Sequence, residues 1–119
     1  MLNDLTKLGY RVSEKRVVER SLLGGRVERL QIVIEGRDVV MRLSELSSRR
    51  FRVSLYVDEE LASVLEDEGL EISELGEGTV AASMSFNTLA EALRFARSMA
   101  TKLAGRELGA SKSKRRGGS

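Results

Sequence analysis

Alternation of apolar and polar residues dominates the middle of the chain and predicts three strands there. Within residues 26–35, every second position from Leu30 to Ile34 is apolar, which is the two-residue period of a half-buried strand. The same period continues over residues 39–44 and 49–57. Because only short polar turns separate these segments, they are expected to form an antiparallel meander.

The C-terminal part predicts one more strand and a long helix. Residues 79–86 alternate in the same way, and apolar residues then recur at three–four spacing over residues 89–103. Thr88 and Glu91 stand in the positions of a capping box, which marks the start of a helix. Between the central strands and this part, residues 58–69 predict a short helix with acids in its first turn, and an extended piece follows it.

The N-terminal segment has a weaker pattern. Leucines at positions 2, 5 and 8 have helical spacing, and Ser13 is placed to cap a second short helix that would end at Gly24-Gly25. A strand that starts near Tyr10 fits the same residues.

These elements predict an α+β fold. A four-stranded, mostly antiparallel sheet would be packed on one face by the C-terminal amphipathic helix and the N-terminal helical segment. Residues 1–104 would form this single domain. Residues 105–119 lose the periodicity and are rich in Lys, Arg, Gly and Ser, so we expect a basic, disordered tail.

Composition excludes many enzyme classes. The 119-residue chain contains no Cys or His, so it lacks soft metal ligands, a thiol nucleophile and an imidazole base. Zinc sites, Cys–His proteases and Ser–His–Asp hydrolases are therefore excluded. Neither a Walker motif nor a GxGxxG motif is present. We expect a protein without catalytic activity, metal or cofactor.

Two further features of the composition bear on the setting of the protein. No apolar run reaches the roughly 18–20 residues that span a bilayer, so we expect a cytoplasmic protein with no membrane partner. Scarce side-chain amides and 32% charged residues are typical of hyperthermophile proteins, although the absence of proline is not.

Charge is segregated along the chain. Residues 1–57 carry 12 Lys and Arg against 7 Asp and Glu, a net charge of +5. Residues 58–78 carry 9 acids and no base, and residues 79–119 carry 8 bases and 2 acids. Two basic regions therefore flank an acidic one, which favours an anionic partner. The acids of residues 58–60 and 66–68 could hold magnesium, but acids at helix ends explain them better.

The candidate binding residues lie on the sheet face that would point away from the helices. They are Arg29, Gln31, Arg42, Arg50, Arg52 and Tyr56, beside the small residues Ala81, Ser83 and Ser85. Arg can contact phosphates, and Arg or Tyr can stack on bases, so this pattern favours single-stranded nucleic acid. Four tail cations, Lys112, Lys114, Arg115 and Arg116, would add attraction.

Two other interpretations of this face remain open. It can be an ordinary solvated surface, or Val33 and Val40 can be covered by another element or subunit.

The order of elements also resembles a known family. An N-terminal helical segment, the strands RVERLQIVIEGRDVVMRLS and FRVSLYV, a last strand TVAASMSF and a closing helix resemble the archaeal single-stranded-DNA-binding family ThermoDBP over residues 1–104. The resemblance implies single-strand binding in a cleft or tunnel lined by sheet residues, and assembly as a dimer or tetramer. This chain has no long leucine-zipper C-terminus, and no binding residue is transferred by a shared motif.

A second resemblance gives the alternative function. Residues 50–103 have a strand–helix–strand–strand–helix order that is similar to the small dimerising subunit of the archaeal KEOPS tRNA-modification complex. We therefore expect a non-catalytic protein that binds single-stranded nucleic acid, DNA before RNA, as a homo-oligomer. The alternative is an assembly subunit that dimerises or docks on another protein.

Overall fold

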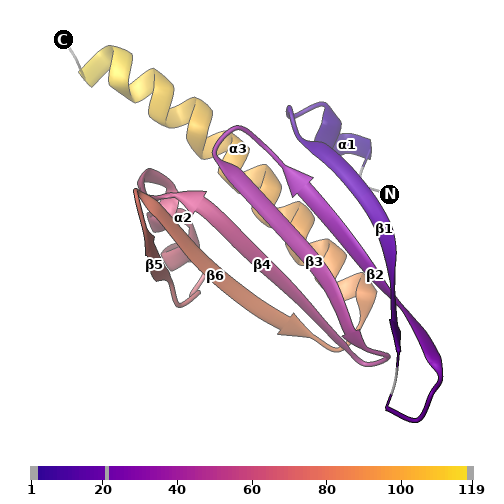
Figure 1. Cartoon of the computed structure of the whole chain (residues 1–119). Helices are drawn as coiled ribbons and strands as arrows, with labels where there is room; N and C mark the ends of the chain where they lie inside the picture. Colours follow the sequence, from indigo (N-terminus) through magenta and orange to yellow (C-terminus); the bar gives the residue numbers. More distant parts are fainter. Residues whose placement is uncertain (1–2, 21, 118–119) are drawn as a thin grey trace.

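The computed structural model describes residues 3–20 and 22–117, with side chains described from Asp4 to Gly105 except at residue 21. The chain forms an α+β fold in which one antiparallel sheet packs against a long C-terminal helix (Figure 1). The strands are β1 (Arg11–Arg20), β2 (Arg26–Glu35), β3 (Val39–Ser47), β4 (Arg50–Asp58), β5 (Ser73–Gly76) and β6 (Thr79–Phe86). The helical elements are α1 (Asn3–Thr6), the 3-10 turn η1 (Glu59–Leu61), α2 (Ala62–Asp67) and α3 (Leu89–Gly117).

The sheet has the order β1-β2-β3-β4-β6-β5, and all neighbouring strands are antiparallel. Consecutive hairpins join β1 to β4, which confirms the predicted meander. The connection from β4 to β6 contains η1, α2 and β5, so β1 and β5 form the two edges. Figure 1 shows α3 running diagonally behind the central strands, and among the described elements no helix covers the opposite face.

The expectation of a four-stranded sheet is wrong, because the described residues form six strands. The second N-terminal helix is replaced by β1, which pairs with β2 from Arg11 opposite Glu35 to Arg20 opposite Arg26. This segment is rich in valine, which favours strands because a β-branched side chain loses rotamer freedom in a helix. A ten-residue strand also satisfies its backbone along the whole hairpin, whereas a short isolated helix is unstable.

The other unexpected strand is β5, which lies in the extended piece predicted before residue 76. It is four residues long and pairs only with β6 within the described chain. The sequence alone did not indicate this pairing because the segment is too short to show an alternating pattern.

The predicted N-terminal helix is present but short. α1 comprises four residues, and its Leu5 is fully buried while Leu8, beyond the helix, is 44% exposed. Leu2, the first leucine of the predicted pattern, lies outside the described residues.

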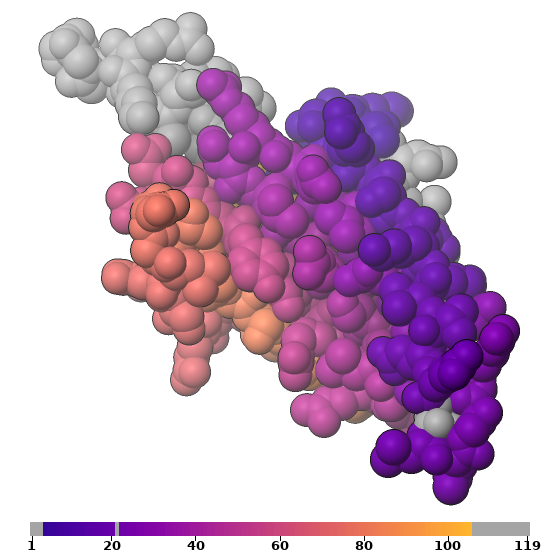
Figure 2. Space-filling view, viewed as in Figure 1, coloured from indigo at the N-terminus to yellow at the C-terminus, as the bar shows by residue number. Residues whose placement is uncertain are grey.

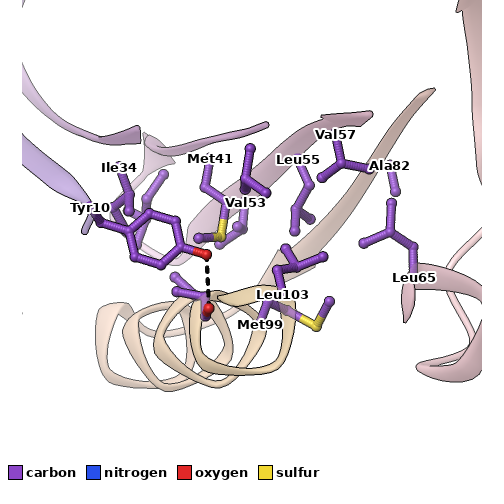
Figure 3. Packing of buried hydrophobic residues seen from close by; sticks show 14 of the residues in the cluster. Tyr10, Ile34, Met41, Val53, Leu55, Val57, Leu65, Ala82, Met99 and Leu103 are labelled. Atoms are coloured by element: carbon purple, nitrogen blue, oxygen red, sulfur yellow. Dashed lines mark hydrogen bonds between the residues drawn. The ribbon is translucent and has the colours of Figure 1, made fainter. Parts of the chain in front are cut away.

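The core fills the space between the sheet and α3. Figure 3 shows sheet residues such as Met41, Val53 and Leu55 pointing toward Met99 and Leu103 of the helix, and all five are at most 1% exposed. Tyr10 enters the same layer, and its hydroxyl donates a hydrogen bond of 2.8 Å to the carbonyl oxygen of Ala100. This bond satisfies the one polar atom of a buried ring. The alternation seen in the sequence therefore identified the buried face correctly.

α3 begins as predicted and packs through small residues. The Thr88 Oγ1 accepts a hydrogen bond of 3.2 Å from the Glu91 backbone N–H and donates one to the Glu91 carboxylate, so Thr88 caps the helix through its side chain. Ala92, Ala96 and Ala100 are fully buried, so these small residues bring the helix close to the sheet. The helix backbone continues to Gly117, beyond residue 103, where the predicted helical pattern ends. That residues 105–119 form a disordered tail in solution stays a prediction.

The β1–β2 hairpin extends past the rest of the sheet. β2 pairs with β3 only from Gln31 to Glu35, and the Leu30 backbone N–H donates instead to the Glu45 carboxylate at 2.9 Å. Residues 26–30 therefore pair only with residues 16–20 of β1 in the described chain. We call this two-stranded projection, residues 16–20 and 22–30, the arm. With it the molecule is elongated, with extents of 64 × 29 × 22 Å.

Candidate nucleic-acid interface

The sheet face opposite α3 is built from the polar half of each alternating strand. Because side chains alternate across a strand and paired residues share a face, the strand register identifies every residue on this side. We call it the open face. Figure 2 views the molecule from this side and shows side chains of β1 to β4 and β6 forming a broad surface, with α3 mostly hidden behind them.

One row of polar residues crosses the open face through five strands. Lys15 pairs with Gln31, Gln31 with Ser44, Ser44 with Arg52, and Arg52 with Ser85. Four strand spacings of about 4.8 Å give this row a length of about 19 Å. The row offers two cations at separate points, with an amide and two hydroxyls between or beside them.

The next two rows add a cation and then a ring on the same side of Arg52. Arg42 lies opposite Val33 and Ser54, and both Arg42 and Arg52 are exposed. Arg42 is the diagonal neighbour of Arg52 and of Tyr56, at about 7–8 Å between Cα atoms. Tyr56 is half-buried between Val40 and Ala81. The small Ala81 leaves the β6 side of the ring uncovered by any large cross-strand neighbour.

Two predicted site residues lie at the margins. Arg29 is on the open face of the arm, where its Nε lies 3.7 Å from a Glu19 carboxylate oxygen and its side chain is 23% exposed. This ion pair neutralises part of the charge that the sequence assigned to binding. Arg50 is exposed at the start of β4, opposite Ser47 at the end of β3. The register thus brings Gln31, Arg42, Arg52 and Tyr56 together and leaves these two at the edge.

β1 adds two cations that the sequence prediction missed. Arg11 and Lys15 lie on the open face, opposite Glu35 and Gln31. They were missed because the strand that starts near Tyr10 was only an alternative to a helix capped by Ser13, and a helix scatters its residues over several faces. The signal that could have found them is the valine content of residues 12–18, followed by a Gly24-Gly25 turn and an alternating strand of equal length.

The four tail cations cannot be assigned to the open face. Lys112, Lys114, Arg115 and Arg116 belong to the α3 backbone beyond Gly105, and their side chains lie outside the described residues. Their contribution to binding stays a prediction.

The acidic segment lies away from the central rows. Asp58 caps η1 by accepting a 2.9 Å hydrogen bond from the Glu60 backbone N–H, and Glu68 after α2 forms an ion pair with Lys102 of α3. Among the described residues, no group of three or more acids is arranged to hold a metal ion. Asp58 thus acts as a helix cap, and Glu68 pairs α2 with α3.

Comparison with known proteins adds no constraint on this surface. No protein family, curated protein or solved structure matches the chain. In the part of the chain that is described, no helix is long and apolar enough to cross a membrane.

Proposed function

We propose that this protein binds single-stranded nucleic acid on the open face and has no catalytic role. The observation that carries the proposal is the register that places Arg52 in a polar row across five strands, with Arg42 as its diagonal neighbour and Tyr56 one row beyond Arg42. Sugar-phosphate backbones need cations spaced along a path, and unpaired bases need a flat surface with a ring. Single-stranded DNA in the cytoplasm is our first choice of ligand, which also agrees with the ThermoDBP resemblance.

The strand would follow the polar row. Arg52 and Lys15 would contact phosphates near the two ends, while Gln31, Ser44 and Ser85 donate hydrogen bonds to phosphate or sugar oxygens. The Tyr56 ring would stack on one base. With one ring, two rows away from this path, binding relies on charge more than on stacking, so affinity should fall steeply with salt.

The test is binding of labelled oligo-dT, single-stranded RNA, duplex DNA and structured RNA at two salt concentrations. We expect the single strands to bind best, and their affinity to fall as salt rises from about 50 to 200 mM. If neither oligo-dT nor single-stranded RNA binds at micromolar protein in low salt, the proposal is wrong.

Substitution of Tyr56 and deletion of the tail distinguish binding by the open face from binding by the tail. Tyr56→Ala should weaken binding by about 1–3 kcal/mol, the range for loss of a stacked base, with little change in the salt slope because no charge is removed. Tyr56→Phe is the matched control, since it keeps the ring and should bind almost normally. Deletion of residues 110–119 removes four cations, so it should flatten the salt slope without changing base preference. Normal binding by Tyr56→Ala, with binding abolished by the deletion, would rule out the open-face site.

A second candidate function is assembly, and the long edge of β1 favours it. β1 pairs only with β2 among the described strands, so its other side offers a ten-residue edge to another chain. If two copies pair through β1 about a two-fold axis perpendicular to the sheet, each face of the sheet continues across the dimer. Two residues can then lie opposite each other only if both are odd-numbered or both are even-numbered. One such register places Arg11 opposite Glu19 and Glu14 opposite Arg16 of a second copy, although it also places Lys15 opposite itself.

The dimer can be tested by charge exchange. In that register Arg16→Glu would place acid against Glu14 and dissociate the dimer, whereas Arg16→Glu combined with Glu14→Arg would restore the pairing. Charge reversal at Arg50 and Arg52 should leave assembly unchanged, because neither residue lies on β1. A monomer by light scattering across the accessible concentrations would exclude this candidate.

A further inference from the structure

The tip of the arm carries two leucines that the fold leaves in solvent. Leu22 is 106% exposed and Leu23 is 98% exposed, the highest values among the described large apolar residues. Burying a leucine side chain contributes about 1.5–3 kcal/mol, and neither residue gains this in the isolated chain. Exposed leucines side by side at the end of a projection indicate a surface that meets a partner.

Two arginines stand directly behind these leucines. Arg20 and Arg26 form the last pair of the β1–β2 ladder and lie opposite each other. Like charges in this position destabilise a hairpin, and both residues are exposed. An anion bound between them would remove this repulsion. The described tip, residues 22–26 with Arg20, contains no acid itself, and the nearest acid on the same strand face is Glu28, opposite Val18.

The arm also continues the proposed binding surface. Its β1 strand carries Lys15 of the polar row, and Arg20 follows five positions later on the other face of the strand, because side chains alternate along β1. Figure 1 shows the two strands of the arm twisting around each other beyond the end of β3, as isolated ribbons do. A nucleic acid that leaves the open face along β1 would therefore pass toward the tip.

We infer that the arm is a wedge for stacked bases. Where a single strand bound on the open face joins a duplex, Leu22 and Leu23 insert at the first base pairs while Arg20 and Arg26 contact the flanking phosphates. Apolar side chains inserted between base steps, with cations beside them, are a general way of opening or kinking a duplex. This inference rests on the proposed function, since the open face supplies the single strand.

Nucleic acid fits the arm better than an anionic lipid surface does. Two leucines are enough for a wedge at one base step, but they are a small anchor for a membrane. Glu19 and Glu28 also lie among the cations of the arm. An arm lying flat on an anionic membrane would bring these acids against it, whereas a wedge presents only the tip.

The experiment uses the full chain and two DNA probes. One is oligo-dT, and the other is the same oligo-dT joined to a hairpin duplex with 2-aminopurine in the first base pair. We expect the protein to raise 2-aminopurine fluorescence at the junction by unstacking the base. Leu22→Ser combined with Leu23→Ser should abolish this rise and weaken junction binding by about tenfold, within the range for loss of a base contact. The same variant should bind oligo-dT within about twofold of the original protein.

Control variants distinguish the loss of the tip side chains from the loss of any exposed leucine or arginine. Leu75→Ser removes a leucine that is 57% exposed on β5, at the opposite edge of the sheet, and should leave junction binding unchanged. Arg20→Gln combined with Arg26→Gln should weaken junction binding, whereas Arg94→Gln on the exposed side of α3 should not. Because the leucines are exposed, the double serine variant should keep the melting temperature.

The outcomes are distinguishable. If oligo-dT binds but the leucine variant gives the same junction affinity and fluorescence as the original protein, the wedge is refuted and the proposed function stands. Failure of both probes to bind refutes both. If the variant loses binding to vesicles of anionic and neutral phospholipid but not to the junction, the tip is a membrane contact and the inference is wrong.

Discussion

Substituting Gly36 by alanine tests the contact between Gly36 and the Tyr10 ring, which holds the segment before β1 against the sheet. Gly36 lies in the β2–β3 turn, and its missing side chain leaves space for the Tyr10 ring. A Cβ at this position would lie 2.5 Å from Tyr10 Cε1 and 2.8 Å from Cδ1. Ordinary carbon contacts are about 3.5–4.0 Å, so the ring would have to retreat by about 1 Å.

The ring has little room for this movement. It is 5% exposed, and its hydroxyl is bonded to the Ala100 carbonyl of α3 at 2.8 Å. Overpacking of a core costs about 1–3 kcal/mol, and a strained or lost hydrogen bond adds up to about 1 kcal/mol. The backbone of Gly36 lies outside the left-handed region, so alanine also gains about 0.4–1 kcal/mol by restricting the unfolded chain. The net loss should be about 2 kcal/mol.

A double-mutant cycle measured by chemical and thermal unfolding tests this reasoning. Gly36→Ala should lower the melting temperature by about 8 °C, at about 4 °C per kcal/mol. In the Tyr10→Leu background the same substitution should be neutral or slightly stabilising, because the ring is gone, whereas in the Tyr10→Phe background it should keep its cost. Gly105→Ala, which meets no atom within 4 Å, should stabilise α3. An equal cost of Gly36→Ala with and without the Tyr10 ring would refute the proposed clash.

Three other changes test the packing and the open face. Thr88→Ala should destabilise the protein by about 1 kcal/mol in urea unfolding, because the cap on the Glu91 N–H is lost, and Thr88→Ser should restore most of it. Leu103→Ala should cost about 2–5 kcal/mol, since this side chain is fully buried; a cost below 1 kcal/mol would contradict the packing of α3. Arg42→Gln should weaken oligo-dT binding and reduce the salt slope by about 1, while Arg94→Gln on α3 should change neither.

Much of the candidate site could be predicted from the sequence because it depends on alternation. The apolar period of β2, β3, β4 and β6 determines which residues face the helix, and the remaining positions, including Arg42, Arg52 and Tyr56, then share the other face. A one-residue error in the assigned register of any strand would have moved all the side chains of one face to the other face. The strong apolar pattern of each strand excludes that error.

The state of residues 11–20 could not be predicted in the same way. Their side chains are almost all exposed in the strand, so the buried face that produces a clear period is missing. Only the pairing with β2 makes this segment a strand, and with it Arg11 and Lys15 join the open face. The sequence likewise gave no sign that Arg29 would be paired with Glu19, because the ion pair exists only in the hairpin register.

The sequence by itself therefore determined the elements whose burial repeats locally: four strands, the capped α3 and the two faces of the central sheet. Tertiary structure decided the features that depend on partners distant in the chain. These are the pairing of the edge strands, the contact of Tyr10 with Gly36 and Ala100, and the projection of the arm. The physical reason is that a side chain's hydrophobicity is a local property, whereas a backbone hydrogen bond or a close contact across 90 residues is satisfied only once the chain has folded.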